Sequence, residues 1–456
     1  MSSQLFDVWN WQGKVGRTRY LISGLLLLAI KHNLDRLVAA LYGYPWRILN
    51  YWVSDIPSGI ATITRREASF YALLIVIALP FIWIGTVLTL RRLRDANLPL
   101  WLVPLFFLPF FNLAFFIILV AIPSEAPRDR EQLSSRFARW IPRGEFGSAA
   151  LGVLVTAGLS VLITTLSANG LGSYGWGLFV GIPFFLGLNS VLIYGYHQPR
   201  SLGRCLLVAL LSTALVGISL FAVAIEGLIC LIMALPLAIV LALFGGFIGF
   251  VLQQRRSFSN QSLRVVSVGF LLMPGLTLLE YSIGETSPVY AVKTSVVIEA
   301  NAETVWSNVV SFAQLPPPTE TIFKTGIAYP IRADIAGHGV GAVRHCVFST
   351  GEFVEPITVW DEPRLLSFSV SGQPPAMEEM SIYSNLHPPH VEHYLISNRG
   401  QFELKSLPDG TTLLEGTTWY QNRFWPGVYW HLWSDAIIHR IHKRVLVHIK
   451  NLSEHK

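Results

Sequence analysis

The stretch between residues 264 and 299 divides this chain into two kinds of sequence. Residues 265–279 are an apolar run closed by Glu280, and we expect this span to be long enough to cross a bilayer, which takes about 20 apolar residues. After a short joint at 284–288, residues 290–299 form a β-rich run typical of a strand that enters a soluble domain. The chain is therefore expected to be a membrane protein up to residue 283 and water-soluble after it. Because the joint is short, the soluble domain must lie close to the membrane surface.

Composition agrees with this division. Of the 456 residues, 52% are hydrophobic and only 14% are charged, whereas a soluble domain carries about a quarter charged residues. Up to residue 283 there are 21 Lys and Arg against 11 Asp and Glu, and from residue 284 onward there are 13 against 17. The basic residues of the first part fall in short clusters between apolar runs, as in cytoplasmic membrane loops, so a nucleic-acid partner is not expected.

About eight apolar segments are predicted, with seven or eight true crossings. They are residues 20–41, 69–90, 98–122, 149–167, 176–196, 205–225, 228–252 and 265–279. This pattern divides the membrane part into residues 1–125, an Arg-rich polar linker at 126–147, and further helices at 148–283. Pro104, Pro109 and Asn112 interrupt the third segment, which either crosses straight or dips in and returns.

The loops between the later segments suggest an orientation. The connection at 197–204 carries Arg200 and Arg204, and the one at 253–264 carries three arginines, whereas 169–175 and 226–227 carry no Lys or Arg. Cytoplasmic loops are enriched in Lys and Arg. We therefore expect a multi-pass protein of the bacterial inner membrane whose soluble domain is on the non-cytoplasmic side. Glu226, at a segment end, is expected to need no functional role.

Two basic clusters flank the first two apolar segments. They supply the candidate residues for binding lipid headgroups, which are Lys14, Arg17, Arg19, Arg91 and Arg92. The simpler alternative is that these cations only lie at the interface beside anchoring aromatic residues.

The same clusters carry a family resemblance. Gly13-Lys14-x-x-Arg17-x-x-Tyr20 and Arg91-Arg92-Leu93-x-Asp95 resemble the two signatures of the bacterial inner-membrane family named domain of unknown function 805. Lys14, Arg94 and Asn97 stand where that pattern has Arg, His and Gly. The resemblance covers about residues 5–125 and implies a membrane fold, but no activity.

The second half is predicted to be α+β. Strands are expected at residues 289–299, 341–350, 353–361, 365–371, 393–405 and 411–419. Apolar residues then recur every three to five positions over 428–452, which predicts a long C-terminal helix. Glycines at 337, 339 and 341 precede a strand, so they indicate a hairpin turn and not a phosphate-binding loop.

Residues 288–456 resemble the START-like superfamily, also called the polyketide cyclase (SRPBCC) or helix-grip fold. The matching stretches are 295–306, 339–344, 360–365, 414–420 and the closing helix. The resemblance implies a curved antiparallel sheet around the last helix, with an apolar cavity between them. Members bind lipids, sterols, polyketides or hormones, and some are cyclases. No catalytic set runs through the superfamily, so no catalytic residue is assigned here.

The residues expected to line that cavity are mostly aromatic. They are Trp360, Phe368, Trp419, Tyr429, Trp433, Ala436 and Ile437.

Ten of the twelve histidines lie in the second half. One set is His387, His390 and His393, and another places Asp435, His439 and His442 on one helix face. Either could bind zinc or serve acid–base chemistry. The Pro388–Pro389 pair instead favours an exposed loop, Asp435 and His439 could form a helix ion pair, and neither set has a recognised metal spacing. No metal and no cofactor are expected.

Three functions follow from these observations. The first is a membrane-anchored START-like protein that binds an apolar small molecule such as a lipid, with membrane lipids as partners. The second is a cyclase- or dehydratase-like enzyme that uses histidines or Arg344 around the cavity. The third is a sensory or protein-contact module without a ligand. An all-apolar cavity would favour the first, convergent polar groups the second, and a filled core the third.

The orientation can be tested by fusion. Alkaline phosphatase joined after Lys456 should be active, because the charge-free loops place the C-terminus outside the cytoplasm. An inactive phosphatase fusion, paired with a fluorescent cytoplasmic reporter fusion, would reverse the orientation.

Overall fold

A computed structural model describes residues 11–51, 64–107, 111–122, 124, 140–254, 287–383, 386 and 388–454, and scattered positions between 266 and 280. The chain divides into two compact units. One comprises residues 1–156, 187–209 and 244–272, and the other comprises residues 157–186, 210–243 and 273–456. The predicted linker and the last predicted apolar segment lie largely outside the described residues.

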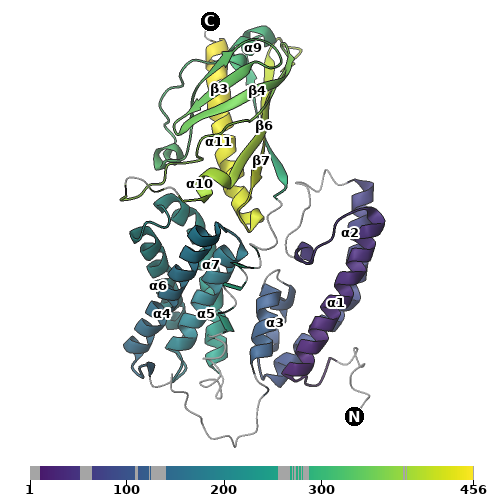
Figure 1. The fold of residues 1–456 in the computed structure, drawn as a ribbon, viewed down its shortest axis with the longest axis vertical. Coiled ribbons are helices and arrows are strands. Elements are labelled where there is room, and N and C mark those ends of the chain that lie inside the picture. Colours follow the sequence, from purple (N-terminus) through teal and green to yellow (C-terminus); the bar gives the residue numbers. More distant parts are fainter. Residues whose placement is uncertain are drawn as a thin grey trace, which may run out of the picture. The chain divides into compact units, whose positions relative to one another are not determined.

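The first part of the chain is helical (Figure 1). Its elements are α1 (Arg17–Tyr42), η1 (Ile48–Tyr51), α2 (Arg65–Asp95), η3 (Leu100–Phe107), α3 (Phe111–Ala121), α4 (Glu145–Thr165), η5 (Leu166–Gly170), η6 (Gly177–Gly181), α5 (Ile182–Tyr194), α6 (Leu202–Ala222) and α7 (Leu228–Gln253). Among the described residues, five helices are long and apolar enough to cross a membrane: 65–95, 145–170, 177–194, 202–222 and 228–253. The predicted membrane part is thus confirmed as helical, with fewer spans described than predicted.

In the first unit, α1 and α2 pack side by side and bury the one acidic residue of α1. Asp35 is fully buried, where Lys31 pairs with it and the Tyr51 hydroxyl donates to it. A charge inside a membrane segment is tolerated when it faces protein and has partners. Lys31 and Asp35 are therefore held inward, whereas the neighbouring Arg36 is exposed.

Arg92 joins the end of α2 to the end of α3. The fully buried Arg92 donates through Nε to the Leu119 carbonyl at 2.9 Å and through another nitrogen to that of Ile122, and it pairs with Asp95. The Ser124 hydroxyl donates to Asp95 at 2.6 Å. Segment 98–122 therefore starts and finishes at the same end of α2. With only 11 residues in α3, about 16 Å at 1.5 Å per residue, this favours a segment that dips in and returns.

The soluble half is one antiparallel sheet of seven strands in the order β1-β7-β6-β5-β4-β3-β2. The strands are β1 (Val289–Ile298), β2 (Pro330–Ala336), β3 (Val343–Phe348), β4 (Gly351–Asp361), β5 (Leu365–Ser369), β6 (Leu395–Ser406) and β7 (Thr412–Asn422). The helical elements of this half are α9 (Ala302–Val310), η7 (Thr321–Thr325), α10 (His390–His393) and α11 (Gly427–Glu454). Six strands match the predicted ones. The seventh, β2, was missed, although its apolar and charged residues alternate as an edge strand requires.

The sheet curves around α11, as the predicted helix-grip fold requires (Figure 1). Val445, Leu446 and Ile449 of α11 pack against Ile298 and Leu414 of the sheet in one buried cluster. The three glycines between β2 and β3 all have positive φ, as expected for a turn. The predicted fold class is confirmed.

Arg344 and Glu355 form a buried ion pair inside this core. They face each other across β3 and β4, and Arg344 is 1% exposed. The guanidinium also lies over the rings of Phe312, Phe368 and Phe402 at 5.4–5.6 Å. The Arg344 charge thus has its counter-ion within the fold, while its Nε has no hydrogen-bond partner among the described residues.

Breaking this pair should destabilise the soluble domain. Arg344→Met leaves the Glu355 carboxylate buried without its partner and should cost about 3–5 kcal/mol, whereas Arg344→Met with Glu355→Leu should recover most of that loss. Thermal unfolding of the purified full chain, followed by tryptophan fluorescence, measures both. A double variant no more stable than the single one would contradict the assignment.

Candidate functional site

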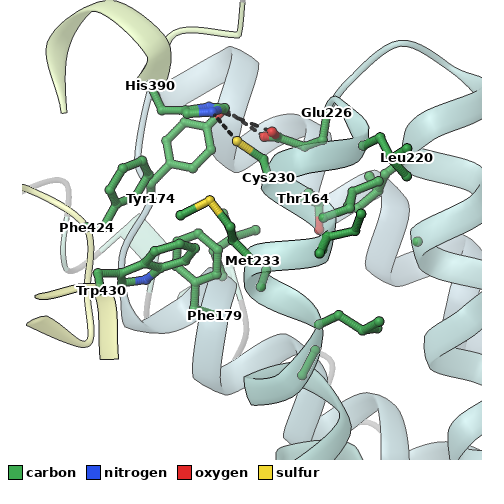
Figure 2. Close-up of a pocket in the computed structure, with 18 of the residues that line it drawn as sticks. Thr164, Tyr174, Phe179, Leu220, Glu226, Cys230, Met233, His390, Phe424 and Trp430 are labelled. Carbon is green, nitrogen blue, oxygen red and sulfur yellow. Dashed lines mark hydrogen bonds and ion pairs between the residues drawn. The ribbon is translucent and has the colours of Figure 1, made fainter. Parts of the chain in front are cut away.

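One apolar cavity has a volume of about 500 Å³ and lies wholly within the second unit. Residues from η6, α5, α6 and α7 form one part of its wall, and residues from α10, β6, β7 and α11 form the other. Its lining is nearly all apolar, with Phe179, Met233 and Trp430 close together (Figure 2). Cavities of about 300–1,000 Å³ with this lining commonly hold small molecules.

Some lining residues are also exposed on the outside of the helices. Ile218 of α6 is 65% exposed and Ile232 of α7 is 49% exposed, yet both border the cavity. Both helices are long and apolar enough to span a membrane, so such exposed apolar side chains would contact acyl chains. The cavity is therefore bordered by surface that lipid would cover.

Polar side chains gather at one end of the cavity (Figure 2). His390 Nε2 lies 2.9 Å from Cys230 Sγ, and His390 Nδ1 lies 3.7 Å from a Glu226 oxygen. Glu379 comes within 3.6 Å of His390 Nε2, and the Tyr174 hydroxyl donates to Glu226 at 2.9 Å. An imidazole, a thiol and two carboxyl groups thus form one buried cluster.

The backbone fixes Glu379 at this place. The Glu378 N–H donates to the Gly326 carbonyl at 2.9 Å, and the Leu228 N–H donates to the Met380 carbonyl at 3.0 Å. A Cβ on Gly227 would lie 1.8 Å from a Glu379 oxygen, so only glycine leaves room for that carboxyl group. The loop between α6 and α7 and the segment around Glu379 therefore fit one another closely.

His390 begins the short helix α10 and is buried by aromatic rings. Its ring centroid lies 4.8 Å from that of Tyr174 and 5.6 Å from that of Phe424. The Tyr394 hydroxyl donates to the Gly172 carbonyl, which fastens the end of α10 to the loop that carries Tyr174. His390 is consequently held with 4% of its surface exposed.

Burial dominates the electrostatics of the two titratable groups that lie in loops here. It raises the pKa of Glu226 above the usual carboxyl range, although His390 opposes the rise. Burial also raises the pKa of Tyr174, and the neighbouring Glu226 adds to the effect. At neutral pH the Tyr174 hydroxyl keeps its proton and donates a hydrogen bond, and Glu226 ionises less readily than an exposed carboxyl group.

The space between the sheet and α11 is much smaller. It measures about 120 Å³ and is bordered by Arg344, Glu355, Phe368 and His442. This is below the size of common ligand sites. The fold therefore leaves more room beside the first turns of α11 than between its middle and the sheet.

The structure places the seven predicted cavity residues in several surroundings. Trp433 and Ile437 line the large cavity, and Phe368 lines the small one. Tyr429 donates to the Met233 carbonyl, and Trp360 packs against Trp306 with ring centroids 5.7 Å apart.

The other two lie elsewhere. Trp419 is covered by the Arg399 guanidinium, 3.9 Å from its ring. Ala436 borders a shallow surface hollow with Asp435 and His439. The helix face that looks into the large cavity is therefore the one with Trp430, Trp433 and Ile437.

The five residues predicted to bind lipid headgroups also lie in different surroundings. Lys14, Arg17 and Arg19 are exposed at the start of α1, and Arg91 is half-buried. Arg92 is used inside the protein, where it holds the end of α3. A headgroup role for the first four stays a prediction.

The predictions for the histidines have different outcomes. The expectation of an exposed loop around His390 is wrong, because α10 packs this side chain against Tyr174 and Phe424. His387 lies outside the described residues. His439 and His442 both lie near the Thr294 hydroxyl, at 2.8 and 3.2 Å.

The sequence analysis missed Glu226, Cys230 and Glu379. A signal existed for the first two, because a carboxyl group and a thiol lie only four residues apart where an apolar run starts. Glu379 had no such signal, since only the pairing of residues 376–378 with 326–328 brings it here.

Residues 8–130 match the family model described as "Protein of unknown function (DUF805)". This confirms the resemblance expected for the N-terminal part. No curated protein matches the chain.

Solved structures that are similar to part of the chain include the following three. Norcoclaurine synthase from Thalictrum flavum is 10% identical with a TM-score of 0.24, covering 37% of this chain and 96% of its own. ZhuI aromatase/cyclase from a Streptomyces species is 15% identical with a TM-score of 0.24, covering 36% and 94%. XoxI from Bacillus cereus is 16% identical with a TM-score of 0.23, covering 35% and 93%.

His442 in the small cavity should make stability depend on pH. Burial, and secondarily His439, lower the pKa of His442 from 6.5 to about 4, while its ring bonds to the hydroxyls of Thr418 and Thr294. The folded state thus favours neutral imidazole. Stability is fully present above pH 6.5 and should fall by on the order of 3 kcal/mol as the pH drops toward 4.

His442→Gln should flatten this part of the curve, and His338→Gln, on an exposed turn, serves as its control. Thermal midpoints of the full chain between pH 7 and 4 provide the measurement. Equal slopes for the parent and His442→Gln would rule out this role.

Proposed function

We propose that this membrane protein binds a hydrophobic ligand of the lipid class in the 500 Å³ cavity. The protein joins apolar spanning helices to a START-like domain, and both contribute to the wall of the cavity. The single observation that carries the proposal is the pairing of an apolar lining with exposed lining residues on α6 and α7. An apolar molecule could then pass from the bilayer into the cavity without crossing water.

The energetics explain why such a ligand would need the polar end of the cavity. Transferring apolar area out of water gains about 25 cal/mol per Å². An acyl chain that comes from the bilayer gains little of this, because it leaves surroundings as apolar as a leucine-lined wall. Discrimination between ligands must therefore come from Tyr174, Glu226, Cys230 and His390.

These polar groups suit a ligand whose head can exchange hydrogen bonds. At neutral pH Tyr174 supplies a hydroxyl already engaged with Glu226, and His390 lies between Glu226 and Cys230. The proposed ligand thus has an apolar body and a small polar head. The proposed setting is the bacterial inner membrane, with the soluble domain on the non-cytoplasmic side.

A cyclase- or dehydratase-like activity is the second candidate function. The observation that favours it is the convergence of His390, Cys230 and two carboxyl groups on one end of the cavity. Proton transfer requires groups of this kind within hydrogen-bond reach of a substrate. Binding is ranked first because the rest of the lining offers little chemistry.

Filling the cavity should compete with the ligand. Gly217 of α6 lines the cavity, and a Cβ there would have no atom within 4 Å. Gly217→Leu should therefore reduce binding of a fluorescent fatty-acyl probe at least tenfold without unfolding the protein, because leucine favours a helix over glycine by up to about 1 kcal/mol.

Gly203→Leu is the matched control. Gly203 lies in the same helix with the same open space but does not line the cavity. Binding is measured on the full chain in detergent, with thermal unfolding as a check on folding. A folded parent that binds no such probe would refute the proposal, as would equal loss of binding in both variants.

A further inference from the structure

The geometry points to a zinc site formed by Cys230, His390 and Glu379 where the loop before α7 meets the START-like domain. Donor atoms of Glu226, Cys230 and His390 all lie within 4.8 Å of one another. Glu379 adds a carboxyl oxygen 3.6 Å from His390 Nε2, the nitrogen that also faces Cys230. We assign Cys230, His390 through Nε2, and Glu379 as the ligands of one divalent ion, with Glu226 facing the other ring nitrogen, Nδ1.

The distances fit a four-coordinate ion. Zinc binds sulfur at about 2.3 Å and nitrogen or oxygen at about 2.0–2.2 Å, so tetrahedral ligands lie roughly 3.5 Å apart. The observed separations of 2.9 Å between Cys230 and His390, and 3.6 Å between Glu379 and His390, lie on either side of that value. Small shifts of these side chains would therefore bring the donor atoms to the separations that zinc requires.

A buried carboxyl group that faces His390 and Cys230 without a close hydrogen bond is the independent observation. The Glu379 side chain has no exposed surface, and neither of its oxygens has a hydrogen-bond partner among the described residues. His390 Nδ1 lacks one as well. A buried polar group without a partner costs about 1–3 kcal/mol, and more when charged. A cation at this place would satisfy the Glu379 carboxylate.

Charge also favours a cation here. Two carboxyl groups and a thiol surround a single imidazole, so the cluster has more anionic than cationic capacity. Binding a divalent ion would release the thiol proton, and any carboxyl proton, to solvent. A thiolate with an imidazole and a carboxylate is a donor set suited to zinc, whereas magnesium and calcium prefer oxygen alone.

The surrounding residues would support such an ion. The Tyr174 hydroxyl donates to the Glu226 oxygen not nearest His390, which would orient this carboxylate. Glu226 and Cys230 flank the start of α7, whereas Glu379 and His390 belong to the soluble domain. The ion would therefore link a membrane helix to the domain that covers the cavity.

Metal content of the purified full chain tests this inference without reference to any lipid. The protein is equilibrated with Zn²⁺ in detergent and freed of excess ion, and zinc per chain is measured by mass spectrometry. We expect about one zinc per chain. Loading with Co²⁺ instead should produce a thiolate-to-cobalt absorption band, which only a sulfur ligand gives.

Three variants make the test specific. Cys230→Ser should abolish the band, and the isosteric Glu379→Gln should weaken zinc binding at least tenfold. Cys346→Ser, which removes a buried thiol in the sheet–helix core, should change neither. Zinc bound equally by the parent and both cluster variants, or no zinc in the folded parent, would overturn the assignment. Glu379→Gln keeps the test decisive if Cys230→Ser does not fold.

Discussion

The close fit between the α6–α7 loop and the segment around Glu379 is the constraint on which the cavity depends. The Leu228 N–H donates to the Met380 carbonyl, the Tyr383 hydroxyl donates to the Ala222 carbonyl, and Gly227 leaves room for Glu379. One of these contacts joins backbone to backbone, and the other two place the Tyr383 and Glu379 side chains against the backbone of the loop. Ile229 and Met233 of α7 can then pack with Trp430 and Ile437 of α11 in one buried cluster.

This arrangement differs from a cavity enclosed by the soluble domain alone. The space between the sheet and the middle of α11 is filled by aliphatic and aromatic residues and by Arg344, which leaves a cavity of about 120 Å³. The larger space lies beside the first turns of α11, where membrane helices provide the missing wall. A ligand there would contact both parts of the chain, so its binding would also stabilise their association.

The sequence predicted the fold better than the site, for a physical reason. Alternating strand patterns and the repeating apolar positions of 428–452 are local signals, and they predicted six of the seven strands and α11 to within a few residues. The cavity depends on contacts between residues such as Glu226 and His390, which are far apart in sequence. The aromatic residues at 360 and 419 looked like cavity wall, but only the folded structure shows that Trp306 and Arg399 cover them.

Native mass spectrometry of the full chain, released gently from detergent, tests whether the cavity holds a hydrophobic ligand. The proposed function predicts that one apolar small molecule of lipid size is retained per chain under conditions that strip the annular detergent and lipid. It also predicts that this molecule is absent when leucine replaces Gly217 and present when leucine replaces Gly203. A folded parent that carries no such molecule, even after incubation with total membrane lipid extract, would contradict the account.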